Sequence, residues 1–191
     1  MAKPKSKPKS KPKSVTKAKR PAKAPALAIA VVEIDPASFP DDLRAHAIAL
    51  APLVRELRAQ ASKRPKQMFV GPPATRDRVQ ALATHYSASL LPDYTALMML
   101  ADGIRVEDSY RLFTIDELIG PKLTKRSEKL RGGYSDCLPV GLYSLSGGWL
   151  FVMAQWGEPY CEKIGGMKIQ GKSVTPWLAR MVKDAKKLPR F

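Results

Sequence analysis

The sequence is poor in the residues that build most reactive sites. Its 191 residues include only two cysteines and two histidines. Cys137 and Cys161 are too few for a disulfide scaffold and lack Cys-x-x-Cys spacing, so we interpret them as buried free thiols. The sequence also lacks the glycine-rich phosphate-binding motifs, the Gly-x-Ser-x-Gly motif and the His-Glu-x-x-His motif. We therefore predict a protein that is not an enzyme, with no catalytic residues, no cofactor and no bound metal.

A hydrolase is the weakest alternative that the sequence leaves open. Cys137 or Cys161 could pair with His85, but both cysteines fall in strand patterns rather than at a helix start, where a thiolate is stabilised. The acidic pairs at residues 107–108 and 116–117 are adjacent in sequence, as is typical of turns and caps. Nothing in these patterns selects a residue for catalysis.

Long hydrophobic runs are also missing. No apolar stretch approaches the roughly 18–20 residues that a membrane-spanning helix needs. The apolar segment at residues 24–32 is short, contains Pro25 and runs into Glu33 and Asp35, which is untypical of an export signal. We expect a leading strand there and a cytoplasmic protein.

Acidic residues are absent from the start of the chain, where Glu33 is the first. Residues 1–25 hold ten of the 33 basic residues and three tandem copies of Lys-Pro-Lys-Ser. Alternating lysine and proline cannot bury enough apolar surface to offset the entropy of ordering, so we predict a disordered tail. One interpretation is a polyanion-binding arm for nucleic acid or an acidic membrane, and the other is a solubilising extension. The candidate polyanion-binding residues are Lys3, Lys5, Lys7, Lys9, Lys11, Lys13, Lys125 and Arg126.

The rest of the chain changes from helical to strand periodicity and back. Apolar residues at three- and four-residue spacing predict helices from Pro40, from Thr75 and from Pro92, the last ending at Asp102-Gly103. Strand-like runs then occupy residues 110–115, 137–143, 149–155 and 159–164, and a helix capped by Ser173 closes the chain. This order predicts an α+β fold with an antiparallel or mixed sheet of about four to six strands flanked by helices. Pro52 is expected to kink or split the first helix.

Aromatic residues near the predicted hairpins suggest recognition of a partner. Trp156 lies beside Gly157 in a predicted turn, so we take it as the best candidate for an exposed anchor. Trp149 lies in a strand that is apolar on both faces, for which core packing is the alternative. We name four candidate partner-binding residues: Trp156, Tyr160, Tyr110 and Trp149.

Several motifs together resemble the SUKH superfamily, the Smi/Knr-like domains. Residues 71–103 carry a helix with Val79 and Leu82, then Leu-Pro-x-Tyr at residues 91–94, then an apolar helix before Asp-Gly. The later pieces are Leu-Pro-Val-Gly at residues 138–141, Gly-Gly before an apolar strand, and a closing helix with Trp177. The resemblance divides the chain into a tail (1–25), a linker strand with the N-terminal helix (26–70) and a SUKH-like α+β domain (71–187).

The resemblance implies a non-enzymatic protein-binding domain. Bacterial relatives include immunity proteins that neutralise toxins in toxin–antitoxin-like pairs, and fungal relatives regulate cell-wall signalling. Immunity proteins against nucleases are commonly acidic, whereas residues 72–191 hold 17 basic and 12 acidic residues. We therefore expect an immunity or regulatory protein that occludes its partner sterically, with an acidic toxin surface or a non-nuclease partner as the better match. The alternative is a nucleic-acid-associated protein that uses the basic tail.

Overall fold

The computed structural model describes residues 34–87, 89–121, 137–143, 148–153, 160–164 and 166–189. At Cys137, at Tyr143 and in the last three strands it describes the backbone alone. The predicted tail and the leading strand therefore lie outside the described residues. All described residues belong to one compact unit, Val31–Phe191.

The described helices come mainly before the sheet. A short 3-10 helix, η1 (Pro36–Ser38), precedes the long helix α1 (Asp41–Lys63). Then follow α2 (Arg76–Tyr86), α3 (Pro92–Leu100) and α4 (Ile115–Ile119), and α6 (Thr175–Lys187) closes the chain. Pro52 lies inside α1 without splitting it; the side chain is exposed.

Seven strands among the described residues form one sheet, in which every neighbouring pair is antiparallel and the order follows the sequence. They are β1 (Met68–Val70), β2 (Ile104–Val106), β3 (Tyr110–Leu112), β4 (Cys137–Tyr143), β5 (Gly148–Met153), β6 (Tyr160–Ile164) and β7 (Gly166–Gly171). The α+β prediction is confirmed. The sheet has more strands than expected because β1, β2 and β7 were not recognised from the sequence.

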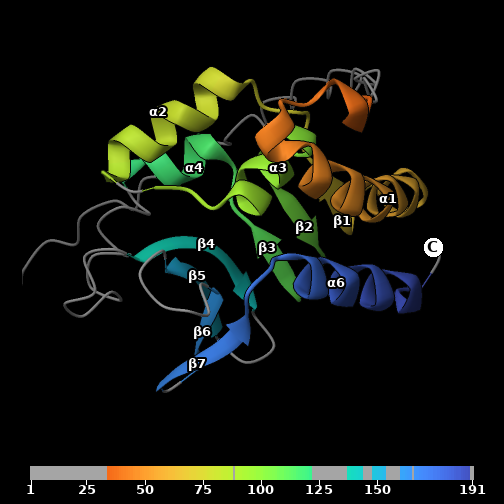
Figure 1. Ribbon diagram of the computed structural model, residues 1–191. Coiled ribbons are helices and arrows are strands. Elements are labelled where there is room, and N and C mark those ends of the chain that lie inside the picture. Colours follow the sequence, from red (N-terminus) through yellow and green to blue (C-terminus); the bar gives the residue numbers. More distant parts are fainter. Residues whose placement is uncertain are drawn as a thin grey trace, which may run out of the picture. The chain divides into compact units, whose positions relative to one another are not determined.

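One face of the sheet is packed against the helices. Met68, Ile104, Val106, Tyr110 and Leu112 are buried and belong to the same hydrophobic core as the apolar sides of the helices. Figure 1 shows the helices gathered around β1, β2 and β3, with β4 to β7 extending beyond them. Alternation along each strand turns the intervening residues to the opposite face.

Two predicted helix ends are shifted in the structure. Helix α3 ends at Leu100 because Ala101 already has extended backbone angles. Gly103 lies beyond the helix with a φ of 89°, a conformation that favours glycine. Helix α6 begins at Thr175, whose backbone N–H donates to Ser173 Oγ at 3.1 Å. Ser173 therefore supports the helix start from one residue further away than expected.

Candidate functional site

The face of the sheet turned away from the core carries a continuous row of residues. In the antiparallel register, Phe69 of β1 lies opposite Arg105 of β2, and Arg105 lies opposite Arg111 of β3. Arg111 in turn lies opposite Leu142 of β4. Directly opposite residues of an antiparallel pair share a face. We call Phe69, Arg105, Arg111 and Leu142 the outer row.

The outer row combines apolar and cationic side chains. Phe69 is 44% exposed, an unusual state for a phenylalanine, and Arg105 and Arg111 are exposed as well. Leu142 is half-buried and packs against the core, so it closes the row at its β4 end rather than adding exposed surface. A shallow hollow of about 270 Å³ lies at this face, where Phe69 and both arginines contribute to the lining. The outer row thus offers an aromatic surface next to two guanidinium groups.

Helix α4 holds one of these arginines in place. Thr114 Oγ1 accepts the backbone N–H of Glu117 at 3.2 Å, and Glu117 Oε2 accepts the backbone N–H of Thr114 at 3.0 Å. This capping box fixes the Glu117 carboxylate, which forms an ion pair with the Arg111 guanidinium. Arg111 also lies 5.8 Å from the centre of the Phe113 ring. Arg105, by contrast, forms no ion pair with any residue that the structure describes.

A buried carboxylate anchors α4 to the rest of the domain. Asp102 Oδ1 accepts the backbone N–H of Ile115 at 2.7 Å. Arg78 of α2 lies 3.4 Å from Asp102 and 2.7 Å from Asp116 of α4. Burial raises the pKa of Asp102, while the hydrogen bond from Ile115 and the charge of Arg78 act against that rise. The start of α4 is thus tied to α2 and to the turn before β2.

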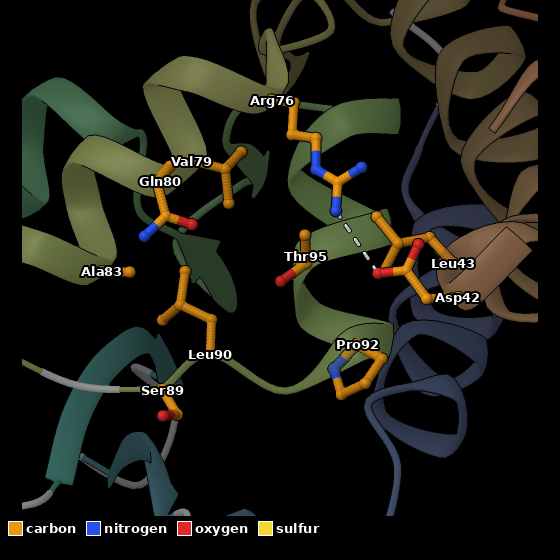
Figure 2. Close-up of a pocket in the computed structure, with 10 residues that line it drawn as sticks. All are labelled: Asp42, Leu43, Arg76, Val79, Gln80, Ala83, Ser89, Leu90, Pro92 and Thr95. Carbon is orange, nitrogen blue, oxygen red and sulfur yellow. Dashed lines mark hydrogen bonds and ion pairs between the residues drawn. The ribbon is translucent and has the colours of Figure 1, made fainter. Parts of the chain in front are cut away.

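A second hollow lies among the helices. It has a volume of about 300 Å³ and is lined by residues of α1, α2 and α3 and of the segment before α3. Figure 2 shows Arg76 reaching toward Asp42, 3.5 Å away, with Thr95 beside them and Gln80 and Leu90 across the hollow. Both charged groups are more than half exposed. Among the described lining residues, the side chains with reactive groups are the hydroxyls of Ser89 and Thr95 and the carboxylate of Asp42, without a histidine or cysteine.

Of the predicted partner-binding residues, only Tyr110 has a described side chain, and that side chain is buried. It is 1% exposed, packs edge-on against Trp177 and donates a hydrogen bond to Asp184 Oδ2 at 2.6 Å. We therefore leave Tyr110 out of the proposed contact surface, because a ring in the core cannot reach a partner. Trp149 lies in β5 and Tyr160 in β6, where the backbone alone is described.

The remaining predicted site residues lie outside the described part of the chain. These are Trp156, Lys3, Lys5, Lys7, Lys9, Lys11, Lys13, Lys125 and Arg126. Among the residues that the structure describes, no group of three or more histidine, cysteine, aspartate or glutamate side chains could hold a metal ion.

The sequence analysis missed Phe69 and Arg105 because it assigned no strand to either. A usable signal was present: the triplets Ile-Arg-Val at residues 104–106 and Tyr-Arg-Leu at residues 110–112 both place a charge between apolar residues. Two such triplets separated by a short turn are typical of a hairpin with one buried face.

Comparison with known proteins adds no family to this picture. The sequence matches no protein-family model, and a search of curated proteins found no match. In the part of the chain that the structure describes, no helix is both long and apolar enough to cross a membrane.

Proposed function

We propose that the protein is a non-enzymatic protein-binding module of SUKH type that acts as an immunity or regulatory protein in the cytoplasm. It would occupy the surface of its partner and block that surface sterically. The contact would be made by the outer row of the sheet. The observation that carries the proposal is the exposed aromatic ring of Phe69 beside Arg105 on a face free of the core.

The composition of the outer row supports binding to a protein. Aromatic residues and arginine are enriched at interfaces and among the residues that contribute most to affinity. Phe69 and Arg105 are neighbours across two paired strands, so the backbone holds them in a fixed relation. A site on strands loses less conformational entropy on binding than a site on a loop.

The order of elements supports the resemblance. The Leu-Pro-x-Tyr motif begins helix α3, with Pro92 in the first turn. The Leu-Pro-Val-Gly motif lies in β4, where Gly141 packs against Trp177 of the closing helix. Both motifs therefore have a structural role in the domain.

The proposal can be tested with the products of neighbouring genes. An immunity protein is expected to be encoded beside its toxin, so each neighbouring product is co-expressed with the full chain and its affinity is measured by calorimetry. We expect one stable complex, weakened at least about tenfold by Phe69→Asp, as for an interface residue of high contribution. Ile48→Asp is the matched control because Ile48 is 55% exposed on α1.

Two results would contradict the proposal. The first is that no neighbouring product binds and no protein partner co-purifies reproducibly from the native host. The second is a complex that Ile48→Asp weakens and Phe69→Asp leaves intact, because such a complex uses the helical surface. Circular dichroism of both variants checks that the fold is retained.

A further inference from the structure

We infer that the partner of the outer row is an acidic protein surface, one that presents carboxylates around an apolar side chain. This inference rests on the proposed function and adds the chemistry of the partner. The evidence for it is the order of side chains along the outer row. From Phe69 to Leu142, across four strands, they are apolar, cationic, cationic and apolar.

Arg105 is the residue of the outer row that would pair with a carboxylate of the partner. It lies in the middle of the outer row, between Phe69 and Arg111, and is exposed. No residue that the structure describes forms an ion pair with it. A partner that covers Phe69 must also cover Arg105, and a covered guanidinium without a counter-charge is strongly unfavourable. Among protein side chains, a carboxylate is the group that can accept two parallel hydrogen bonds from a guanidinium, so it is the protein group that best matches Arg105.

Arg111 differs from Arg105 because Glu117 already neutralises it within the protein. The described charges at this face are therefore two cations and one anion, a net of one positive charge centred on Arg105. Glu117 would also repel a carboxylate placed against Arg111. The structure thus favours an acidic group at the Phe69 end of the outer row rather than at the Leu142 end.

The backbone register continues the outer row without an acidic residue. Leu142 lies opposite Trp149, Trp149 opposite Lys163, and Lys163 opposite Met167. These three residues hold the same row position in β5, β6 and β7. The only charged residue among them, Lys163, is again a cation, so the row contains no acid along its seven register positions.

Two other occupants match the outer row poorly. The N-terminal 32 residues of the chain contain no acidic residue and ten basic ones in their first 25, so their charge is of the same sign as Arg105. A second copy of the chain bound face to face would bring arginine rows together, and like charges in an interface are unfavourable. An acidic partner is the occupant whose charge complements the outer row.

Selection from a peptide library tests this inference without a known partner. Random 12-residue peptides displayed on phage are selected on the full chain and counter-selected on the double variant Phe69→Asp/Arg105→Glu. The double variant keeps the same basic tail, so peptides that bind only the tail are removed. Synthetic copies of the survivors are then measured by fluorescence anisotropy against single variants.

We expect survivors rich in aspartate and glutamate around an aromatic or aliphatic residue. Their affinity should fall at least about tenfold with Arg105→Glu and with Phe69→Asp. Arg180→Glu is the matched charge control, since Arg180 is an exposed cation on α6, and it should change the affinity less than about twofold. A peptide with lysine in place of its key glutamate should regain affinity for Arg105→Glu.

The outcomes separate the two proposals. Survivors that need Phe69 but are not acidic, and that bind Arg105→Glu as tightly as the wild type, would overturn the acidic partner and keep the binding face. An absence of any survivor that needs Phe69 would overturn both. Thermal melting of each variant shows whether a loss of affinity reflects a loss of fold.

Discussion

Asp93 joins two segments that are 81 residues apart: its carboxylate Oδ2 accepts the backbone N–H of Val174 at 2.8 Å. The other oxygen, Oδ1, accepts the backbone N–H of Tyr94 in the first turn of α3 at 2.8 Å. Asp93 is only 5% exposed. One buried side chain therefore satisfies backbone groups at the starts of both α3 and α6, and it positions the closing helix against the core.

Replacing Asp93 should destabilise the domain. Asp93→Ala leaves two N–H groups without an acceptor, and each unsatisfied buried group costs roughly 1–3 kcal/mol. We expect the free energy of unfolding to fall by at least about 2 kcal/mol, measured by urea denaturation. Asp77→Ala is the control, because Asp77 is exposed in the first turn of α2. Equal losses in both variants would contradict a special role for Asp93.

Gly141 should not tolerate a side chain. A Cβ at this position would lie 2.5 Å from the carbonyl oxygen of Arg111 and 3.0 Å from the ring of Trp177. Because the first contact is with the backbone of β3, it cannot be relieved by a rotamer change. We expect Gly141→Ala to lower the free energy of unfolding by about 1–3 kcal/mol, as overpacking does in other cores.

Replacing Trp177 with a smaller residue shows which of the two contacts is responsible for the loss of stability in Gly141→Ala. In Trp177→Leu the ring contact is absent, so adding Gly141→Ala to that variant should still destabilise it through the Arg111 carbonyl. A double-mutant cycle by urea denaturation measures the difference. If Gly141→Ala were harmless in the Trp177→Leu background, the approach of β3 would not be what requires glycine.

The sequence analysis identified the elements with strong periodicity and missed the short ones. Helix α1 was recognisable because Leu43, Ala47, Leu50, Val54 and Leu57 recur at helical spacing and are all buried. Thr75 was expected to cap α2, and its Oγ1 accepts the backbone N–H of Arg78 at 3.3 Å. Patterns of this kind depend only on residues that are near in sequence, so they can be recognised without the structure.

Strands β1 and β2 were harder to find, because three residues are too few to show a period and the sequence signal for β2 is limited to the two alternating triplets around the β2–β3 turn. They are stable because each pairs with a neighbour: Phe69 opposite Arg105, and Arg105 opposite Arg111. The outer row is a consequence of this long-range register. A site assembled from one residue per strand is therefore hard to recognise until the pairing is known, whereas the aromatic candidates were chosen for their residue type and their place in or beside predicted strands and turns.

Tyr110 should contribute to stability rather than to binding. Tyr110→Phe keeps the ring against Trp177 and removes the hydrogen bond to Asp184. We expect a loss of about 1–2 kcal/mol in the free energy of unfolding at neutral pH. Affinity for peptides that need Phe69 should be unchanged. A variant that folds normally but loses those peptides would return Tyr110 to the contact surface.

The same variant has a pH signature. The pKa of Asp184 is lowered, first by the hydrogen bond from Lys187 and then by the one from Tyr110. A lowered pKa in the folded state stabilises the protein above the ordinary carboxyl pKa, and this stabilisation is lost as the pH falls through the folded pKa. The advantage of the wild type over Tyr110→Phe should therefore shrink in acid, which urea denaturation at several pH values will show.

The basic tail can be tested separately from the domain. Nonspecific DNA binding by its ten basic residues would be led by phosphate contacts, so its affinity should fall steeply between about 50 and 200 mM salt. We expect the full chain to bind duplex DNA at low salt and a form lacking residues 1–25 to bind much more weakly, measured by fluorescence anisotropy. Equal binding by both forms would show that the tail is not the contact.

Asp102 should give the domain a stability that decreases as the pH rises through the acidic range. Burial raises the pKa of Asp102, so in this range the unfolded chain releases the proton at a lower pH than the folded one. The stability of the wild type relative to Asp102→Asn should therefore fall between the ordinary carboxyl pKa and the folded pKa. Asparagine cannot titrate but keeps an oxygen for the backbone N–H of Ile115, which Asp102 Oδ1 accepts at 2.7 Å.

Arg78 provides the check on this interpretation, because its positive charge lowers the pKa of Asp102 against the effect of burial. Arg78→Gln should raise the folded pKa further and move the decrease in stability to higher pH. The measurement is urea denaturation from about pH 3 to pH 8 for the wild type and both variants, since this range brackets ordinary and raised carboxyl pKa values. A decrease that stays in place without Arg78, or that persists in Asp102→Asn, would assign the titration to another group.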